Sequence, residues 1–182
     1  MDYKISKSEQ TTQGYNRPGS TERAIEVTLG RRFYAEHKPD IELGAVMPYY
    51  HNTGDTRIID KTDRQGEKLD ASTLDYTGLS VLSISTIEHF WENGGSHQTA
   101  QDFLTRLFHE SRTLLLTFPI GWDKELEKFV FGEHFPFFAY YWDKEWIYCD
   151  DTNPTKYTVF DFKYNSPKPF GNAIVCIHKN CS

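Results

Sequence analysis

The chain has 182 residues, a formal net charge of −6 and an aromatic content of 15%. This length suits one domain with a real core, but it is too short for a catalytic domain plus a separate substrate domain. The acidic balance argues against nucleic acid as a partner, because a phosphate-binding surface needs clustered Lys and Arg. No apolar run approaches transmembrane length, so we expect no membrane span.

The cysteines and the N-terminus indicate the compartment. Cys149, Cys176 and Cys181 all fall late, and Cys176 lies inside the apolar run AIVCI, so no disulfide framework is implied. No charged-then-apolar leader opens the chain. The spacing Cys-x-His-x-x-Cys at 176–181 is not a usual zinc pattern. We expect a cytoplasmic protein without a metal site.

The N-terminal half begins with residues 1–20, which are polar and almost free of aliphatic side chains, so we expect a flexible arm or a lid ordered by ligand. Ser20 or Thr21 then caps a helix over STERAIEVTLGRRFYAEH, because Ser or Thr followed by Glu is a helix-start signal. The segment MPYYHNTGDT has turn chemistry, so the usual helix after the first strand should be short or absent. Strands are expected over 40–46, 57–61 and 66–71.

The C-terminal half contains a fourth strand over 79–84 and a fifth over the apolar run 113–118. Helices are expected over 96–110 and 123–132. Two late strands, 156–164 and 172–179, joined by NSPKPFG, suggest an antiparallel hairpin at the edge of the sheet. The aromatic segment 134–148 can be core or the wall of a concave site, and core is the better reading for most of its side chains.

Polar side chains follow the predicted strands. In an open parallel sheet the ligand lies outside the carboxyl ends of the strands. Glu42 and Gly44 follow the first strand, and Asp60 ends the second, where a carboxylate can accept both ribose hydroxyls. A single glycine counts against NAD or FAD, because a dinucleotide fold uses three to approach a pyrophosphate. The loop after the fourth strand is the densest in such groups: Ser83, Ser85, Thr86, Glu88 and His89.

Three segments carry a resemblance to a known family. They are STERAIEV (20–27), SISTIEHFW (83–91) and LLLTFPIGWD (114–123). Together with the order strand–Glu–x–Gly, strand–Asp, strand–polar loop–Glu–His, they resemble class I S-adenosylmethionine-dependent methyltransferases, and in particular the small enzymes of sugar and surface-polysaccharide modification. Two departures exist: an Asp often found before the fourth strand is displaced to Asp75, and the second and third glycines of the first loop are absent.

The resemblance implies a fold and a cofactor. The fold is α/β and Rossmann-like, a methyltransferase domain over 21–182 with a mostly parallel central sheet, an antiparallel C-terminal hairpin and pared-down helices. The cofactor is S-adenosylmethionine, which leaves as S-adenosylhomocysteine. The residues expected to position it are Glu42, Gly44, Asp60, Asp70, Ser83 and Ser85, with Asp70 near the adenine amino group unless it is only a solvent-facing turn acid.

The resemblance also implies a reaction, O-methylation of a sugar hydroxyl on a glycan or nucleotide sugar, such as a deoxyhexose. His89 is the candidate general base, since an imidazole titrates near neutral pH. Glu88 could orient His89 or hold the cofactor's amino group, and Asp123 is the reserve base. The segment 134–148 and the N-terminal arm would form the acceptor side.

Two other readings stay open. The chain could be a non-catalytic or degenerate cofactor-binding module within a larger glycan-assembly protein, associated with glycosyltransferase domains. An NAD-dependent sugar-modifying enzyme is the third, and the glycine count speaks against it.

Overall fold

The computed structural model describes residues 3–10, 21–90, 96–133, 135–149, 163–164 and 171–180. The α-helices are α1 (Glu22–His37), α2 (His97–Glu110) and α3 (Lys124–Gly132). The strands are β1 (Ile41–Leu43), β2 (Arg57–Ile59), β3 (Ser80–Ile84), β4 (Thr113–Pro119), β5 (Phe137–Asp143), β6 (Glu145–Cys149) and β7 (Ala173–Lys179). Short 3-10 turns occur at Lys7–Glu9 (η1), Met47–Tyr49 (η2), Ala71–Thr73 (η3) and Ile87–His89 (η4).

All seven strands form one mixed sheet in the order β2-β1-β3-β4-β7-β5-β6. β2, β1, β3 and β4 run parallel, with Leu43 opposite Ile59 on one side and Ser83 on the other. β7 is antiparallel to both of its neighbours, β4 and β5, so β5 runs in the same direction as β4. The carboxyl ends of β1 to β5 therefore meet at one edge of the sheet.

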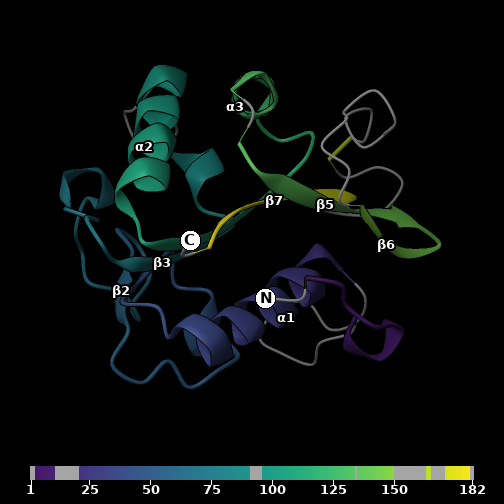
Figure 1. The fold of residues 1–182 in the computed structure, drawn as a ribbon, viewed down its shortest axis with the longest axis horizontal. Helices are drawn as coiled ribbons and strands as arrows, with labels where there is room; N and C mark the ends of the chain where they lie inside the picture. Colours follow the sequence, from purple (N-terminus) through teal and green to yellow (C-terminus); the bar gives the residue numbers. More distant parts are fainter. Residues whose placement is uncertain are drawn as a thin grey trace.

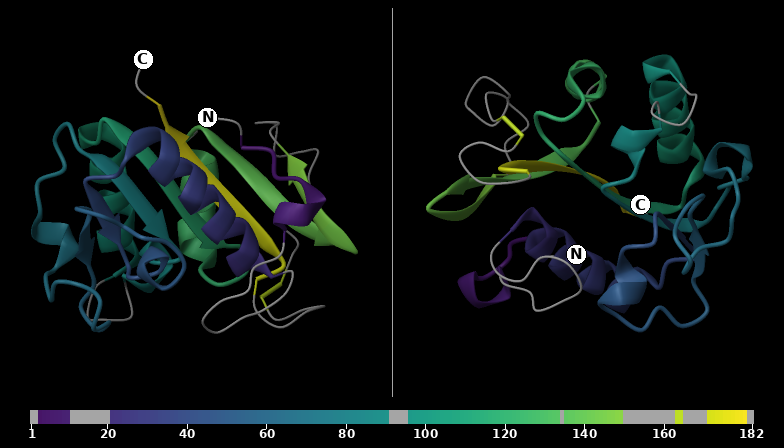
Figure 2. Two further views of the ribbon diagram at one scale, coloured as in Figure 1. Left: turned by 90° about the horizontal axis from the view of Figure 1, so that it is seen from below. Right: turned by 180° about the vertical axis from the view of Figure 1, so that it is seen from behind.

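Helices cover both faces of this sheet (Figures 1 and 2). α1 lies on one face, and α2 and α3 lie on the other. The side chains of β3 show why, because Leu82 and Ile84 join the core under α1 while Val81 joins the core under α2 and α3. A strand that is apolar on both faces needs such two-sided cover. The prediction of an α/β protein is confirmed, and the sheet is mixed: it is parallel from β2 to β4 and antiparallel from β4 through β7 and β5 to β6.

The helix starts follow the predicted signals. Thr21, Ser96 and Asp123 are the N-caps of α1, α2 and α3. The Ser96 hydroxyl accepts a hydrogen bond from Thr99 N, and the Asp123 carboxylate accepts from the amides of Glu125 and Leu126. The connection after β1 contains only the turn η2, as its sequence predicts.

The predicted strand over 66–71 is wrong. The chain makes a single parallel bridge there, between Ile59 and Glu67, and then turns into η3. The segment GEKLDA has no β-branched residue to favour an extended edge strand. Asp70 instead caps η3 through the amide of Ser72.

The predicted C-terminal hairpin is also corrected. β7 confirms the strand expected over 172–179, but it is inserted between β4 and β5 and is not at an edge. Both of its sides are thus occupied, and no side remains for the expected partner over 156–164, of which residues 156–162 lie outside the described residues. The edge hairpin is β5–β6, joined at Lys144, which has a φ of 62°.

The N-terminal segment was expected to be flexible, and residues 3–10 correct this. Tyr3 and Ile5 are buried, and the Tyr3 ring stacks on Phe138 at 4.3 Å between centroids. The Gln10 side chain pairs with the backbone of Trp146 through both its amide nitrogen and its oxygen. Residues 3–10 are therefore part of the layer that covers the sheet beside α1, whereas residues 11–20 lie outside the described part of the chain.

The aromatic segment 134–148 is mostly core, as expected for most of its side chains. It forms β5 and β6, in which Phe138, Tyr140 and Trp146 are buried against α1 and the N-terminal residues. These strands lie at the edge of the sheet opposite β2. The segment thus does not wall the cavity described next.

Candidate functional site

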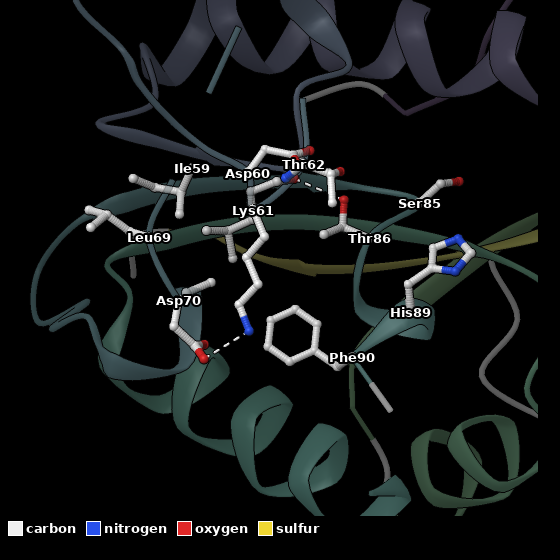
Figure 3. A pocket seen from close by; sticks show the side chains of 13 residues that line it. Ile59, Asp60, Lys61, Thr62, Leu69, Asp70, Ser85, Thr86, His89 and Phe90 are labelled. Carbon is white, nitrogen blue, oxygen red and sulfur yellow. Dashed lines mark hydrogen bonds and ion pairs between the residues drawn. The ribbon is translucent and has the colours of Figure 1, made fainter. Parts of the chain in front are cut away.

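A cavity of about 380 Å³ opens at the carboxyl ends of β1, β2 and β3 (Figure 3). This volume is within the range of small-molecule sites. Its walls come from the loops that follow these three strands and from the segment before η3. The lining residues are Leu43, Gly44, Ile59, Asp60, Lys61, Thr62, Leu69, Asp70, Ala71, Ser85, Thr86, His89 and Phe90.

Two of these loops touch at Gly44, where the chain leaves β1. Gly44 has a φ of 78°, and a Cβ added there would lie 2.0 Å from the Thr86 hydroxyl oxygen. The same hydroxyl hydrogen bonds to the Leu43 carbonyl at 3.0 Å. Only glycine allows both this backbone conformation and this close approach, which explains the single glycine that the sequence keeps in this loop.

Glu42 supports the same loop from behind the sheet and does not line the cavity. One carboxylate oxygen accepts hydrogen bonds from the amides of Val46 and Met47 at 3.0 and 2.7 Å, and the other accepts one from the Tyr34 hydroxyl at 2.8 Å. Burial raises the pKa of Glu42 to about 7, although these donors oppose the rise. The expectation that Glu42 contacts a cofactor directly is thus corrected: its carboxylate ties the β1 loop to α1.

Asp60 lines the cavity at the end of β2. Its Oδ1 accepts hydrogen bonds from Thr62 N, Thr62 Oγ1 and Asp63 N at 2.7 to 3.0 Å. Its Oδ2 accepts one from Ala45 N at 3.1 Å. Burial would raise the pKa of this carboxyl group, but the backbone amides outweigh burial and lower it. Asp60 is therefore a rigid carboxylate whose Oδ2, with one donor, retains capacity for a ligand hydroxyl.

The far end of the cavity contains an ion pair. Lys61 Nζ lies 2.9 Å from Asp70 Oδ2, and both side chains are about half exposed (Figure 3). The Lys61 ammonium, helped by Ser72, lowers the pKa of Asp70 to about 2. Phe90, stacked on Phe103 at 4.5 Å, supplies an aromatic wall beside this pair. An exposed ion pair contributes little stability. A ligand can therefore replace the contact between Lys61 and Asp70 with contacts of its own at little cost.

The two predicted serines differ. Ser83 is buried within β3, between Leu43 and Leu116 on the neighbouring strands, and it is not among the residues that line the cavity. Ser85 lines the cavity in a left-handed conformation, with a φ of 43°. Its hydroxyl bonds to Glu26 Oε1 at 2.5 Å, behind the cavity wall.

The three predicted catalytic residues differ in position, because His89 lines the cavity whereas Glu88 and Asp123 are buried outside its lining. His89 lines the cavity with a side chain 43% exposed, and its Nε2 is 3.9 Å from the buried Glu88 carboxylate, which is beyond hydrogen-bond distance. The His89 ring meets the Trp122 ring edge-on at 5.4 Å. Asp123 is buried next to Trp122 and lies outside the cavity lining.

The structure therefore brings Gly44, Asp60, Asp70, Ser85 and His89 together, and it leaves Glu42, Ser83, Glu88 and Asp123 outside the lining. Sequence reasoning missed Lys61, Leu69 and Phe90. Lys61 and Phe90 directly follow Asp60 and His89, so their place next to predicted site residues was the available signal. Leu69, 38% exposed, had no comparable signal.

A second hollow, of about 620 Å³, lies at the opposite edge of the sheet. It is bordered by Tyr34, His51 and the starts of β1 and β2, and its charged residues are Lys38, Asp40, Asp55 and Arg57. Ligands of open α/β sheets bind at the carboxyl ends of the strands, so the smaller cavity is the better candidate site.

Comparison of the chain with protein-family models, with curated proteins and with solved structures finds no match. Across the described ranges, no group of three or more His, Cys, Asp or Glu side chains is arranged to hold a metal ion. None of the helices in this part of the chain is both long and apolar enough to cross a membrane.

Proposed function

We propose that this protein is an S-adenosylmethionine-dependent O-methyltransferase. The observation that supports the proposal is the convergence of Gly44, Asp60, Asp70, Ser85 and His89, from the segments that follow β1, β2 and β3, on one cavity at the carboxyl ends of these strands. The resemblance implies cofactor-binding or catalytic roles for these five residues. It implies such roles also for Glu42, Ser83, Glu88 and Asp123, which lie outside the lining.

The topology supports this choice among α/β proteins. The resembled family ends its sheet with an antiparallel strand, and here β7 is antiparallel between β4 and β5. The site lies where β1 and β3 are neighbours and the chain order reverses, which is the usual place for a ligand in a doubly wound sheet. These features support a Rossmann-like methyltransferase fold as part of the proposal.

The residues present fit S-adenosylmethionine. Asp60 ends β2, where Oδ2 can accept ribose hydroxyls, and Phe90 and Leu69 offer apolar surface to a flat base next to Asp70. Gly44 keeps open the space that a Cβ would fill, so the cofactor's amino-acid part can pass close to the backbone. When bound, the cofactor supplies an electrophilic methyl group on a sulfonium.

The protein itself must position the methyl donor and the acceptor, exclude water from both, and remove one proton from the acceptor. Gly44, Asp60 and Ser85 hold the donor side, with Glu42 fixing the loop behind Gly44. The acceptor approaches from the His89 side, toward the end of β4. A hydroxyl acceptor loses its proton as the new C–O bond forms and the C–S bond breaks, so a base must lie at this rim, and His89 is the sequence-based candidate.

The acceptor class follows from the resemblance alone. It is a sugar hydroxyl, on a glycan or nucleotide sugar, and the protein would work with glycosyltransferase domains. The rival is a non-catalytic module that binds the cofactor without turnover. The single glycine of the loop after β1, and the short turn η2 that stands there in place of a helix, favour that rival.

Calorimetric titration with S-adenosylmethionine, and separately with S-adenosylhomocysteine, tests the proposal. We expect saturable binding by the native protein, loss of binding in Asp60→Ala, and native binding in the control Asp75→Ala. Asp75 is an exposed turn acid outside the cavity lining. Absence of binding to both compounds would refute the assignment, and binding without turnover on nucleotide sugars would favour the module.

A further inference from the structure

Ser85 has a backbone conformation that L side chains rarely adopt. Its φ is 43°, in the left-handed region. Among the described residues other than glycine, Lys38 and Lys144 also have a positive φ, but Lys38 is the C-cap of α1 and Lys144 joins β5 to β6. Helix ends and hairpin turns commonly require this conformation, whereas Ser85 lines the cavity. A strained residue at a cavity points to a role toward a ligand.

Two hydrogen bonds hold Ser85 in this conformation. Its amide donates to the Thr117 carbonyl at 3.0 Å, and its hydroxyl donates to Glu26 Oε1 at 2.5 Å. Glu26 belongs to α1 and is fully buried, and the same Oε1 accepts a hydrogen bond from the Thr117 hydroxyl at 2.9 Å. The residue that follows β3 is therefore joined to both α1 and β4 at a single carboxylate.

The buried charge of Glu26 is balanced from the same helix. Arg23, one turn earlier in α1, places Nη1 3.2 Å from Glu26 Oε2. A carboxylate buried without a partner is costly, so Arg23 makes this burial tolerable. Buried ion pairs nevertheless add little to stability compared with apolar residues of similar size. A role toward a ligand thus accounts for a charged group at this place better than stability does.

The hydrogen bond to Glu26 determines what Ser85 can offer to a ligand. A serine hydroxyl has one proton and two lone pairs, and an ionised carboxylate can only accept. Because the Ser85 proton is directed to Glu26, the Ser85 oxygen can only accept a hydrogen bond from a ligand. The Thr86 hydroxyl is in the same state, since its proton goes to the carbonyl of Leu43 or Ile84, at 3.0 and 2.9 Å. This part of the cavity wall therefore favours a hydrogen-bond donor, and Glu26 adds negative charge behind it.

The order of residues along the cavity indicates which part of the cofactor meets Ser85. Figure 3 shows Asp70 and Leu69 at one end, Ser85 and His89 at the other, and Asp60 between them. An adenine beside Asp70 and a ribose at Asp60 leave the amino-acid part at the end that contains Ser85. The α-ammonium group of that part is a cation with three N–H donors, which suits a wall that accepts hydrogen bonds.

We propose that Ser85, backed by Glu26, binds the α-ammonium group of the cofactor. The inference rests on the proposed S-adenosylmethionine site and adds the ligand group that this end of the cavity recognises. Ser85 is the residue in contact with the ligand, and Glu26 is a positioning residue that acts through it. The sequence offered Glu88 for this role, but Glu88 is buried outside the cavity lining.

Three ligands isolate the ammonium group in calorimetric titrations. S-Adenosylhomocysteine carries the group, its deaminated analogue lacks only that group, and 5′-methylthioadenosine lacks the whole amino-acid part. All three share adenosine and the sulfur atom. A variant that disturbs the cavity as a whole therefore weakens the binding of all three, whereas loss of the ammonium contact weakens only the binding of S-adenosylhomocysteine.

Ser85→Gly and Glu26→Gln are the test variants. Glycine adopts a positive φ without strain, so Ser85→Gly removes the hydroxyl while the backbone conformation is kept. In Glu26→Gln the side-chain carbonyl can still accept from Ser85, but the negative charge is lost. Thr117→Val is the control, because it removes the other hydroxyl that bonds to Glu26 and leaves the contact with Ser85 in place.

We expect both test variants to bind S-adenosylhomocysteine about 10- to 100-fold more weakly than the native protein, because a hydrogen bond to a charged group contributes this much. Their affinity for the other two ligands should be unchanged, and Thr117→Val should match the native protein with all three. The native protein should itself prefer S-adenosylhomocysteine to the deaminated analogue by a similar factor.

The inference and the proposed function fail in different ways. An equal loss for all three ligands, or native affinity for S-adenosylhomocysteine, in either test variant overturns the inference alone. Equal affinity of the native protein for S-adenosylhomocysteine and its deaminated analogue does the same. If the native protein binds none of the three ligands, nor S-adenosylmethionine, both the inference and the proposed function are overturned.

Discussion

Replacement of Glu42 by Gln tests how the β1 loop is held. The Gln side chain has the same shape, so its carbonyl can accept from the amides of Val46 and Met47 while its amide group donates to Tyr34. Burial raises the pKa of Glu42 from 4.5 to about 7 in the folded protein. The folded state therefore binds this proton more tightly than the unfolded state does, and the stability linked to it is lost as the pH rises through about 7.

The size of this effect follows from the displaced pKa. At about 1.36 kcal/mol per pH unit, the displacement corresponds to about 3 kcal/mol of unfolding free energy. Gln cannot ionise and has no such loss. We expect Glu42→Gln to match the native protein near pH 4.5 and to become more stable than it by up to about 3 kcal/mol at pH 8.

Urea unfolding followed by tryptophan fluorescence at pH 4.5, 6, 7 and 8 measures this difference. Glu67→Gln is the control, because Glu67 is exposed and its hydrogen bond to Arg57 lowers its pKa, which gives a dependence of opposite sign. A difference in unfolding free energy between Glu42→Gln and the native protein that stays constant across this pH range would refute the reasoning. Binding of S-adenosylmethionine should persist in Glu42→Gln, since the loop contacts are kept.

The remaining predictions concern the cavity walls. Gly44→Ala should destabilise the protein by more than about 1 kcal/mol in urea unfolding, because both a positive φ and the Thr86 hydroxyl at 2.0 Å oppose a Cβ. Gly54→Ala, with a φ of 58° but no atom within 4 Å, is the control, and equal losses would contradict the role of the contact. Lys61→Ala should raise the pKa of Asp70 from about 2 toward its ordinary range, measured by carboxyl NMR titration. If the pKa of Asp70 stays near 2 in Lys61→Ala, the hydrogen bonds from Ser72 and not the Lys61 ammonium lower it.

Local patterns predicted the helices and the central strands well. The predicted start of α1 at Ser20 or Thr21 and the acid that opens the segment of α3 are local signals, so a short stretch of sequence contains this information. The apolar runs of β3 and β4 are long enough to be recognised alone. The prediction of a strand over 66–71 failed for another reason. A bridge to Ile59 and a turn capped by Asp70 compete for the same few residues.

The sequence also determined which strand ends carry polar groups. It follows that Gly44, Asp60 and Ser85 lie at one edge, because parallel strands share their direction. It could not determine which way each side chain points. Glu42 and Ser85 turn to partners behind the cavity, Tyr34 and Glu26, which both lie on α1 and are brought there by the packing of this helix on the sheet.

Tertiary structure alone decided the remaining features. The insertion of β7 between β4 and β5 depends on pairing between segments that are far apart in the sequence, which no local pattern records. The contact of His97 with Asp123 likewise arises because α2 and α3 both begin at the carboxyl edge of the sheet. Helix and strand propensities depend on neighbours along the chain, so a short stretch of sequence reveals them. The partners of a buried carboxylate depend instead on how the helices pack on the sheet.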